Sequence, residues 1–201
     1  MSQKLIKKAD KRAKNVGTKV FTPAFRVSFP AVFEPTAMSD KDTPKYAVTM
    51  LFPKDTDISM LKDAVDEAIA EGMDKKWNGK KPKSLRLPFR DGDEDENYSE
   101  KEGFPGHIFV RASSIQPVGL VDKHKTPIED PMDFYAGCYA IATLVAYPYD
   151  TAGNRGIAFG LQNIQKIADG EHFSGRKRAS DDFEDWDDED LESEDDDWDE
   201  E

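Results

Sequence analysis

The chain has 201 residues, with 28 Lys and Arg against 41 Asp and Glu and a formal net charge of −13. Its single cysteine, Cys138, excludes a disulfide within the chain and a cysteine-based zinc site, and fits a reducing compartment. No apolar run is long enough to span a membrane, and no apolar segment follows the basic N-terminus as in a secretion signal. We therefore expect a soluble cytoplasmic protein that has no membrane partner.

The acidic residues are concentrated at the C-terminal end. Residues 181–201 hold 16 acids and no base, so residues 1–180 keep 25 acids against 28 bases, a net charge of +3. Residues 1–19 hold seven bases and one acid. The charge layout predicts a flexible basic arm over 1–19, a folded domain over 20–171, a linker over 172–180 and a disordered acidic tail over 181–201.

Alternating apolar residues predict two strands in the first quarter of the domain. In residues 20–29, one face of the first strand carries Phe25, Val27 and Phe29. A loop rich in Pro, Asp and Ser follows over 30–44. Residues 45–52 then form the second strand, with one face made of Tyr46, Val48, Met50 and Phe52.

One amphipathic helix follows the second strand. Asp57 or Ser59 caps its N-terminus, the helix runs to about Lys76, and Asn78-Gly79 ends it. Its apolar residues recur three and four positions apart, which is typical of a helix packed on a core: Leu61, Ala64, Val65, Ala68, Ile69 and Met73.

The stretch 75–90 combines seven bases with two aromatic residues and has no acid. Lys and Arg neutralise phosphates, while flat aromatic rings stack on unpaired bases, so the stretch predicts contact with nucleic acid. The alternative is a solvated helix end and loop in which Trp77 plugs the barrel. With three less certain contacts added from the strands, the candidate DNA-binding residues are Lys45, Lys75, Lys76, Trp77, Lys80, Lys81, Arg86, Phe89, Arg90, Tyr139 and Tyr147.

The sign of the charge reverses in residues 91–96, Asp-Gly-Asp-Glu-Asp-Glu. Clustered carboxylates can hold a divalent cation, as in metal-dependent nucleases, and Asp91, Asp93 and Glu94 would then be the ligands. The spacing does not match an EF-hand loop. A solvated acidic loop with no metal is the simpler interpretation, and we favour it.

The last strands form the expected centre of the fold. Residues 108–113 alternate as a third strand, with Arg111 among the polar positions, and a Pro-rich connection over 117–132 leads to a hairpin. Its first strand, 138–147, has apolar residues on both faces, which suggests that both faces pack against protein, as in a small closed barrel. Pro148 is expected to end that strand, and 150–156 to form a loop. In the second strand, 157–162, Gly160 would allow a bulge.

Short runs along the domain resemble a family of phage-encoded single-stranded DNA-binding proteins. The runs are Lys45–Lys54 (KYAVTMLFPK), Leu87–Asp93 (LPFRDGD), Tyr135–Gly137 (YAG), Asn154–Leu161 (NRGIAFGL) and Lys166–Glu171 (KIADGE). The resemblance covers residues 20–171 together with the style of the tail. It implies a mainly β, OB-fold-like five-stranded barrel with one α-helix between the second and third strands.

The same resemblance implies a protein that coats single-stranded DNA without strong sequence preference during phage DNA replication or recombination. The chain has no Walker, GxSxG or HExxH motif, which favours a binding protein without a cofactor over an enzyme. We expect the tail to compete with DNA and to recruit phage or host replication proteins, with Phe183, Trp186 and Trp198 as its aromatic contacts. The alternatives are a metal-dependent nuclease that uses the 91–96 cluster and an acidic chaperone or DNA mimic that binds basic proteins.

Overall fold

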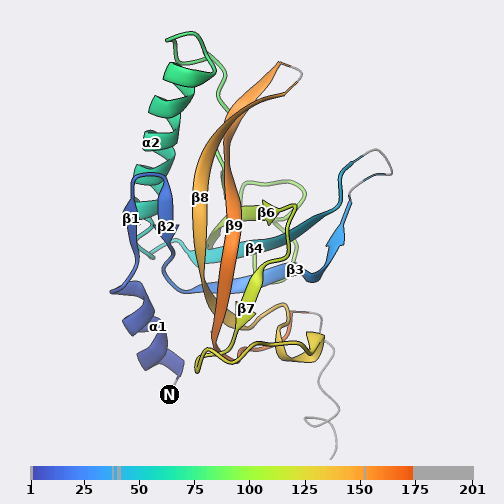
Figure 1. The fold of residues 1–201 in the computed structure, drawn as a ribbon. Coiled ribbons are helices and arrows are strands. Elements are labelled where there is room, and N and C mark those ends of the chain that lie inside the picture. The colour runs from blue at the N-terminus through green and yellow to red at the C-terminus, as the bar shows by residue number, and fades with distance from the viewer. Residues whose placement is uncertain (1, 38, 40–41, 152, 174–201) are drawn as a thin grey trace, which may run out of the picture.

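Five long strands close into a ring (Figure 1). The computed structural model describes residues 2–37, 39, 42–151 and 153–173. Around the ring the order is β8–β3–β4–β6–β9, and pairing of β8 with β9 closes it. All of these pairs are antiparallel except β6–β9. The ring strands are β3 (Phe25–Thr36), β4 (Lys45–Pro53), β6 (His107–Ser114), β8 (Tyr139–Thr151) and β9 (Asn154–Ala168). The predicted OB-like barrel is confirmed.

Four short strands extend this ring. A hairpin of β1 (Lys14–Val16) and β2 (Lys19–Phe21) adds to β8. β5 (Phe89–Asp91) pairs with β6, and β7 (Gly119–Val121) runs parallel to β9. A 3-10 turn, η1 (Pro131–Asp133), precedes β8. The extra strands leave the five-stranded ring as the central architecture.

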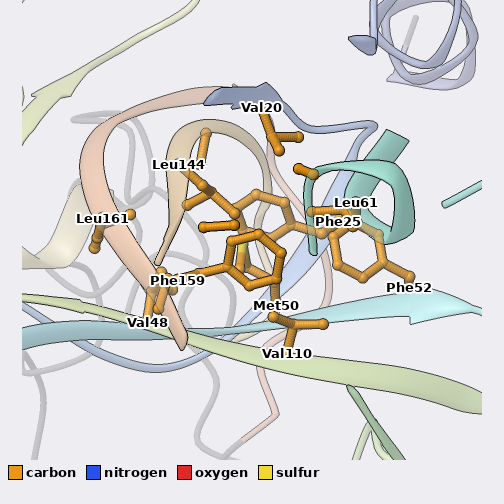
Figure 2. Close-up of a cluster of buried hydrophobic side chains, with 14 of the residues drawn as sticks. Val20, Phe25, Val48, Met50, Phe52, Leu61, Val110, Leu144, Phe159 and Leu161 are labelled. Carbon is orange, nitrogen blue, oxygen red and sulfur yellow. The ribbon is translucent and has the colours of Figure 1, made fainter. Parts of the chain in front are cut away.

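The barrel core lies between the ring and one long helix, α2 (Ser59–Lys75), which falls between β4 and β6 as predicted. The N-cap is Ile58, which offers no side-chain hydrogen bond, so the prediction of Asp57 or Ser59 as the cap was wrong. The Asp57 carboxylate accepts the Ser59 backbone N–H at 2.9 Å just before the helix, and this hydrogen bond lowers the pKa of the carboxyl. Apolar side chains from the ring converge on Leu61 of this helix (Figure 2). The labelled ones include Val48, Met50, Phe52, Val110, Leu144 and Phe159, all at most 1% exposed.

Residues 2–19, which we expected to form a mobile arm, are folded. Residues Ser2–Asp10 form a second helix, α1, which was not predicted. Ile6 and Ala9 of α1 pack on Ile141 of β8 and Ile167 of β9, in a cluster that we call the α1 cluster. The Asp10 carboxylate accepts the Ala24 N–H at 2.9 Å. One apolar side of a short basic helix is therefore enough to hold the N-terminal segment on the barrel.

The β8–β9 hairpin is longer than predicted, because β8 continues through Pro148 to Thr151. The Ala146 N–H donates to the Thr18 carbonyl, away from β9. Backbone N–H groups two residues apart point to the same side of a strand, so an N–H at position 148 would also point away from β9. Proline at this position therefore removes no hydrogen bond between β8 and β9. β8 and β9 occupy most of the expected loop over 150–156. In the β8–β9 register, the residues of β9 without a partner in β8 are Gln162 and Ile167, so the bulges lie there and not at Gly160.

The two faces of β8 also differ more than predicted. Alternate residues from Cys138 to Ala146 are at most 4% exposed, whereas those from Tyr139 to Val145 are only partly buried. Burial raises the pKa of the Cys138 thiol to about 11. Only one face of this strand therefore lies in the core, and the other is free to form a surface.

In the described part of the chain, neither helix is long and apolar enough to cross a membrane.

Candidate nucleic-acid interface

The outer face of β4 and β6 carries the exposed Arg111 beside apolar residues, because Leu51 and Phe109 are buried there with Phe104 in a second, smaller cluster. The two strands pair residue by residue, which places Thr49 opposite Arg111 and Leu51 opposite Phe109. β5 adds Arg90 opposite Phe109 on the same face. In chain order, β4 and β6 are the second and third strands of the ring. In OB-fold barrels this pair of strands is the usual surface for oligonucleotides.

A groove of about 580 Å³ lies on this outer face. Three arginines from different segments converge on it: Arg86 from the connection after α2, Arg90 from β5 and Arg111 from β6. Two tyrosines, Tyr98 and Tyr149, supply aromatic rings. The other lining residues are Thr49, Leu87, Pro88, Phe109, Ile157 and Ala158. Guanidinium groups bind the phosphates of a single strand, and the flat aromatic rings beside them stack on its bases.

Backbone pairing with β9 fixes Arg86 in the groove. Its N–H donates to the Arg155 carbonyl and its own carbonyl accepts the Ile157 N–H, both at 2.9 Å. Gly156 between them leaves room for this approach, since a Cβ there would lie 2.5 Å from both the Arg86 carbonyl oxygen and the Tyr149 hydroxyl oxygen. Glycine at this position thus lets one arginine and one tyrosine of the groove lie side by side.

Arg90 is held by a carboxylate and two rings. It forms an ion pair with Asp95, and its guanidinium carbon lies 5.2 Å from the ring centroids of both Tyr98 and Phe109. The side chain remains 48% exposed. A cation that is packed on aromatic faces keeps a defined direction while its N–H groups stay available to a phosphate.

A second hollow, of about 470 Å³, shares Arg111 with the groove. It lies toward the connection between β3 and β4, and its lining includes Lys45, Thr36 and Ser113. Together the groove and this hollow follow the outer face from the tip of the β8–β9 hairpin to the connection between β3 and β4. Figure 1 shows these two hairpins reaching out from the barrel in different directions.

The structure brings some of the candidate residues to this surface. Arg86 and Arg90 line the groove, and Lys45 lines the hollow beside it. Tyr147 is 39% exposed and lies on the same face of β8 as Tyr149; burial of part of its ring raises the pKa of its hydroxyl.

Other candidates lie elsewhere. Trp77 is 4% exposed in the core, against Gly72 and Pro148, so the expectation that it stacks on bases was wrong and the barrel-plug alternative holds. Phe89 packs on Phe159, with ring centroids 6.3 Å apart. Tyr139 lies in the α1 cluster, with the Arg26 guanidinium carbon 5.3 Å from its ring centroid.

The lysines of the basic stretch are exposed but do not line the groove. Lys75 and Lys76 lie at the end of α2, where Lys75 pairs with Glu71 at 3.7 Å, and Lys80 follows them. Lys81 lines a separate hollow of about 480 Å³ between α2 and residues 81–89. The tail residues Phe183, Trp186 and Trp198 lie outside the described residues.

Sequence reasoning missed Arg111, Tyr98 and Tyr149. The sequence could have indicated Arg111 as a binding residue, because it is the charged residue on the polar face of a predicted strand. Tyr98 lies in an acidic loop, and only the folding of that loop over Leu51 and Phe109 shows where its ring goes.

A lysine bridges two carboxylates of the acidic cluster that begins at the end of β5. The Lys54 ammonium lies 2.7 Å from carboxylate oxygens of both Asp91 and Asp93. Its hydrogen bonds lower the pKa of both carboxyls and raise the pKa of Lys54. Within the described residues, no group of three His, Cys, Asp or Glu is arranged to hold a metal ion. The geometry thus favours a structural ion-pair cluster over the nuclease alternative.

Comparison with known proteins agrees with this fold. A family model described as "Enterobacter phage Enc34, ssDNA-binding protein" matches residues 18–195. Protein p50 of Acyrthosiphon pisum secondary endosymbiont phage 1 is 32% identical over 168 residues, which cover 77% of this chain and 86% of that protein.

Two solved structures have a similar fold. The Enc34 single-stranded DNA-binding protein in complex with ssDNA gives a TM-score of 0.69 at 22% identity, covering 81% of this chain and 97% of that one. The single-stranded DNA-binding protein gp2.5 of bacteriophage T7 gives a TM-score of 0.55 at 12% identity, covering 80% and 97%. The resemblance inferred from the sequence is confirmed, and the chain belongs to the Enc34 family of phage ssDNA-binding proteins.

Proposed function

We propose that this protein binds single-stranded DNA in the arginine groove of the β4–β6 face, without strong sequence preference, during phage DNA replication or recombination. The observation that carries the proposal is the convergence of Arg86, Arg90 and Arg111 with Tyr98 and Tyr149 in one groove. Arginines neutralise the backbone and rings stack on any base, which is a sequence-tolerant mode of binding. Its family and structural neighbours are ssDNA-binding proteins, which are not enzymes.

The groove favours unpaired DNA over a duplex. Stacking on Tyr98 and Tyr149 requires bases whose faces are open, and a duplex does not offer them. Phosphate contacts alone are available to both forms of DNA, and they weaken as salt rises. The difference in affinity between single strand and duplex should therefore persist at salt concentrations where phosphate contacts contribute little.

The test is a titration of the protein with a fluorescent dT oligonucleotide, with duplex DNA and with RNA of equal length. We expect tighter binding of the single strand than of the duplex, and a fall of log affinity with log salt of about 0.7 per phosphate neutralised. Equal affinity for both DNA forms would indicate a polycation effect of the basic N-terminal residues and would contradict the proposal. If residues 1–180, without the acidic tail, had no affinity for DNA, the alternative of an acidic chaperone or DNA mimic would explain the protein better.

We also propose that the acidic tail competes with DNA for this groove and, once displaced, recruits replication proteins. Support comes from where the described chain ends. Phe173 packs beside Leu51 and Phe109 on the outer face, and the Arg26 guanidinium carbon lies 4.3 Å from its ring centroid. The segment that leads to the tail thus starts on the DNA-facing side of the barrel, where a tethered polyanion has a high effective concentration.

A further inference from the structure

A bulge in β3 turns one phenylalanine away from the core. The β3–β4 register gains one residue in β3 between Ser28 and Ala31. By the alternation of the preceding residues, Phe29 would point into the barrel, yet its side chain is 48% exposed. A bulge of this kind re-aims side chains, and here it brings Phe29 to the same outer face as the arginine groove.

Phe29 also has an unfavourable backbone conformation. Its φ of +44° lies in the left-handed region, which glycine adopts readily and a side chain with a Cβ does not. At bulges of the common type with a left-handed residue, that position is usually glycine. A large exposed aromatic residue kept in this conformation indicates that its ring is used.

Around the ring lie an aromatic wall and a cation. The ring centroid of Phe29 is 6.4 Å from that of Tyr98 and 5.9 Å from that of Phe104. The Lys101 ammonium lies 5.2 Å from the centroid of Phe29 and 4.6 Å from that of Tyr98. Tyr98 also lines the arginine groove, so Phe29 and Lys101 adjoin that groove through their contacts with Tyr98.

We propose that Phe29 and Lys101 form an additional nucleotide subsite at this end of the groove. An unpaired base stacks on the exposed face of Phe29, and the Lys101 ammonium, displaced from the ring, binds the phosphate of the same nucleotide. The inference rests on the proposed function and extends it, because it assigns a ligand to residues outside the arginine groove. The competing explanation is that Phe29 only covers the buried ring of Phe104.

Three substitutions at position 29 separate these explanations in the full-length protein. Phe29→Gly removes the ring and suits the backbone, Phe29→Leu keeps an apolar cover without a flat face, and Phe29→Trp keeps the flat face. With a dT oligonucleotide long enough to fill the groove, we expect Phe29→Trp to bind as tightly as the unmodified protein. Phe29→Gly and Phe29→Leu should each bind about tenfold more weakly, the usual scale for loss of one stacked base.

Thermal unfolding gives the independent readout. Because glycine relieves the left-handed conformation, Phe29→Gly should be at least as stable as Phe29→Leu although both lose affinity. Lys101→Gln should lower the salt dependence of log affinity by about 0.7, as expected for one lost phosphate contact.

Either of two results would reject the subsite. One is normal affinity of Phe29→Leu, and the other is an affinity that follows thermal stability across the three variants. If the unmodified protein itself fails to bind single strands, the proposed function fails, and the subsite fails with it. Normal binding by the unmodified protein together with normal binding by Phe29→Leu rejects the subsite alone.

Discussion

A Cβ atom at Gly156 would lie 2.5 Å from the hydroxyl oxygen of Tyr149 and equally close to the Arg86 carbonyl oxygen. Both neighbours belong to the arginine groove, so the absence of a side chain at position 156 sets the width of one end of it. Gly156→Ala should push Arg86 and Tyr149 apart and weaken binding of single-stranded DNA. Fluorescence anisotropy with a dT oligonucleotide measures the effect.

Gly160→Ala on the same strand is the matched control for that substitution. Its Cβ would meet atoms no closer than 3.6 Å, which is ordinary van der Waals contact. We expect Gly160→Ala to bind normally. Equal loss of affinity in both variants would mean that β9 tolerates no side chain at either position, and that the groove is not the cause.

Removal of Arg111 should affect DNA binding more than removal of Lys75. Arg111 borders both the groove and the adjoining hollow, whereas Lys75 lies at the end of α2 beside Glu71. Arg111→Ala should lower the slope of log affinity against log salt by about 0.7, because one phosphate contact is lost. Lys75→Ala should leave both slope and affinity unchanged, and the opposite ranking would move the interface to the basic stretch after α2.

Trp77 and Tyr149 should give opposite phenotypes. Trp77 is buried, so Trp77→Ala should lower the free energy of unfolding by about 3–5 kcal/mol, the typical cost of truncating a large core aromatic residue. Tyr149→Ala should instead weaken single-strand binding, by about 1–3 kcal/mol if one stacked base is lost. Chemical denaturation and DNA titration of both variants test the pair. Weak binding by folded Trp77→Ala would contradict the core assignment.

Truncation after Ser180 should tighten single-strand binding at low salt, because it removes 16 competing carboxylates. The difference between truncated and full-length protein should shrink as salt rises, since the contact between tail and groove is screened as well. Equal binding of the two proteins at low salt would leave the tail with a solubilising role. Arg86→Ala in both backgrounds should reduce the difference if the groove is where the tail binds.

The Lys54 cluster predicts a specific dependence of stability on pH. The pKa values of Asp91 and Asp93 are lowered in the folded protein, mainly by hydrogen bonds from Lys54. Groups of this kind contribute stability above their unfolded pKa of about 3.9, and the contribution is lost as pH falls through the lowered folded values. Lys54→Met should therefore unfold at a lower temperature than the unmodified protein at pH 7, and the difference should shrink as pH falls below the unfolded pKa of about 3.9. A constant difference at all pH values would indicate lost packing of the lysine stem instead.

The architecture was largely predictable because it follows from local patterns. Alternation over 45–52 and helical spacing from Leu61 to Met73 predicted β4 and α2, and the structure has both there, although residues 47–52 of β4 are buried on both faces. The helix α1 was missed because its apolar side is narrow and its bases suggested solvent. The exact ends of β8 were missed because Pro148 blocks pairing on one side of the strand only.

The interface was predicted only in part, because it depends on contacts between distant segments. Arg86 and Arg90 were named from composition, but the burial of Trp77 depends on the lack of a side chain at Gly72, against which the indole ring packs. Alternation placed Phe29 on the same face as Phe25 and Val27, and a one-residue register shift against β4 reverses its direction. Neither effect leaves a trace in the periodicity of the sequence.

Pro148 has a consequence for the proposed coating of single-stranded DNA by many copies of the protein. Among the described residues, no strand pairs with β8 beyond Ala146 on the side away from β9. Open strand edges invite edge-to-edge association when molecules are crowded together. Pro148 offers no N–H to a foreign strand, and it is itself buried against Gly72 of α2. The ion pair of Asp150 with Arg155 at the tip of the same hairpin adds charge to that edge. Under that proposal, the hairpin extends beyond the barrel without offering this edge of β8 to a neighbouring copy.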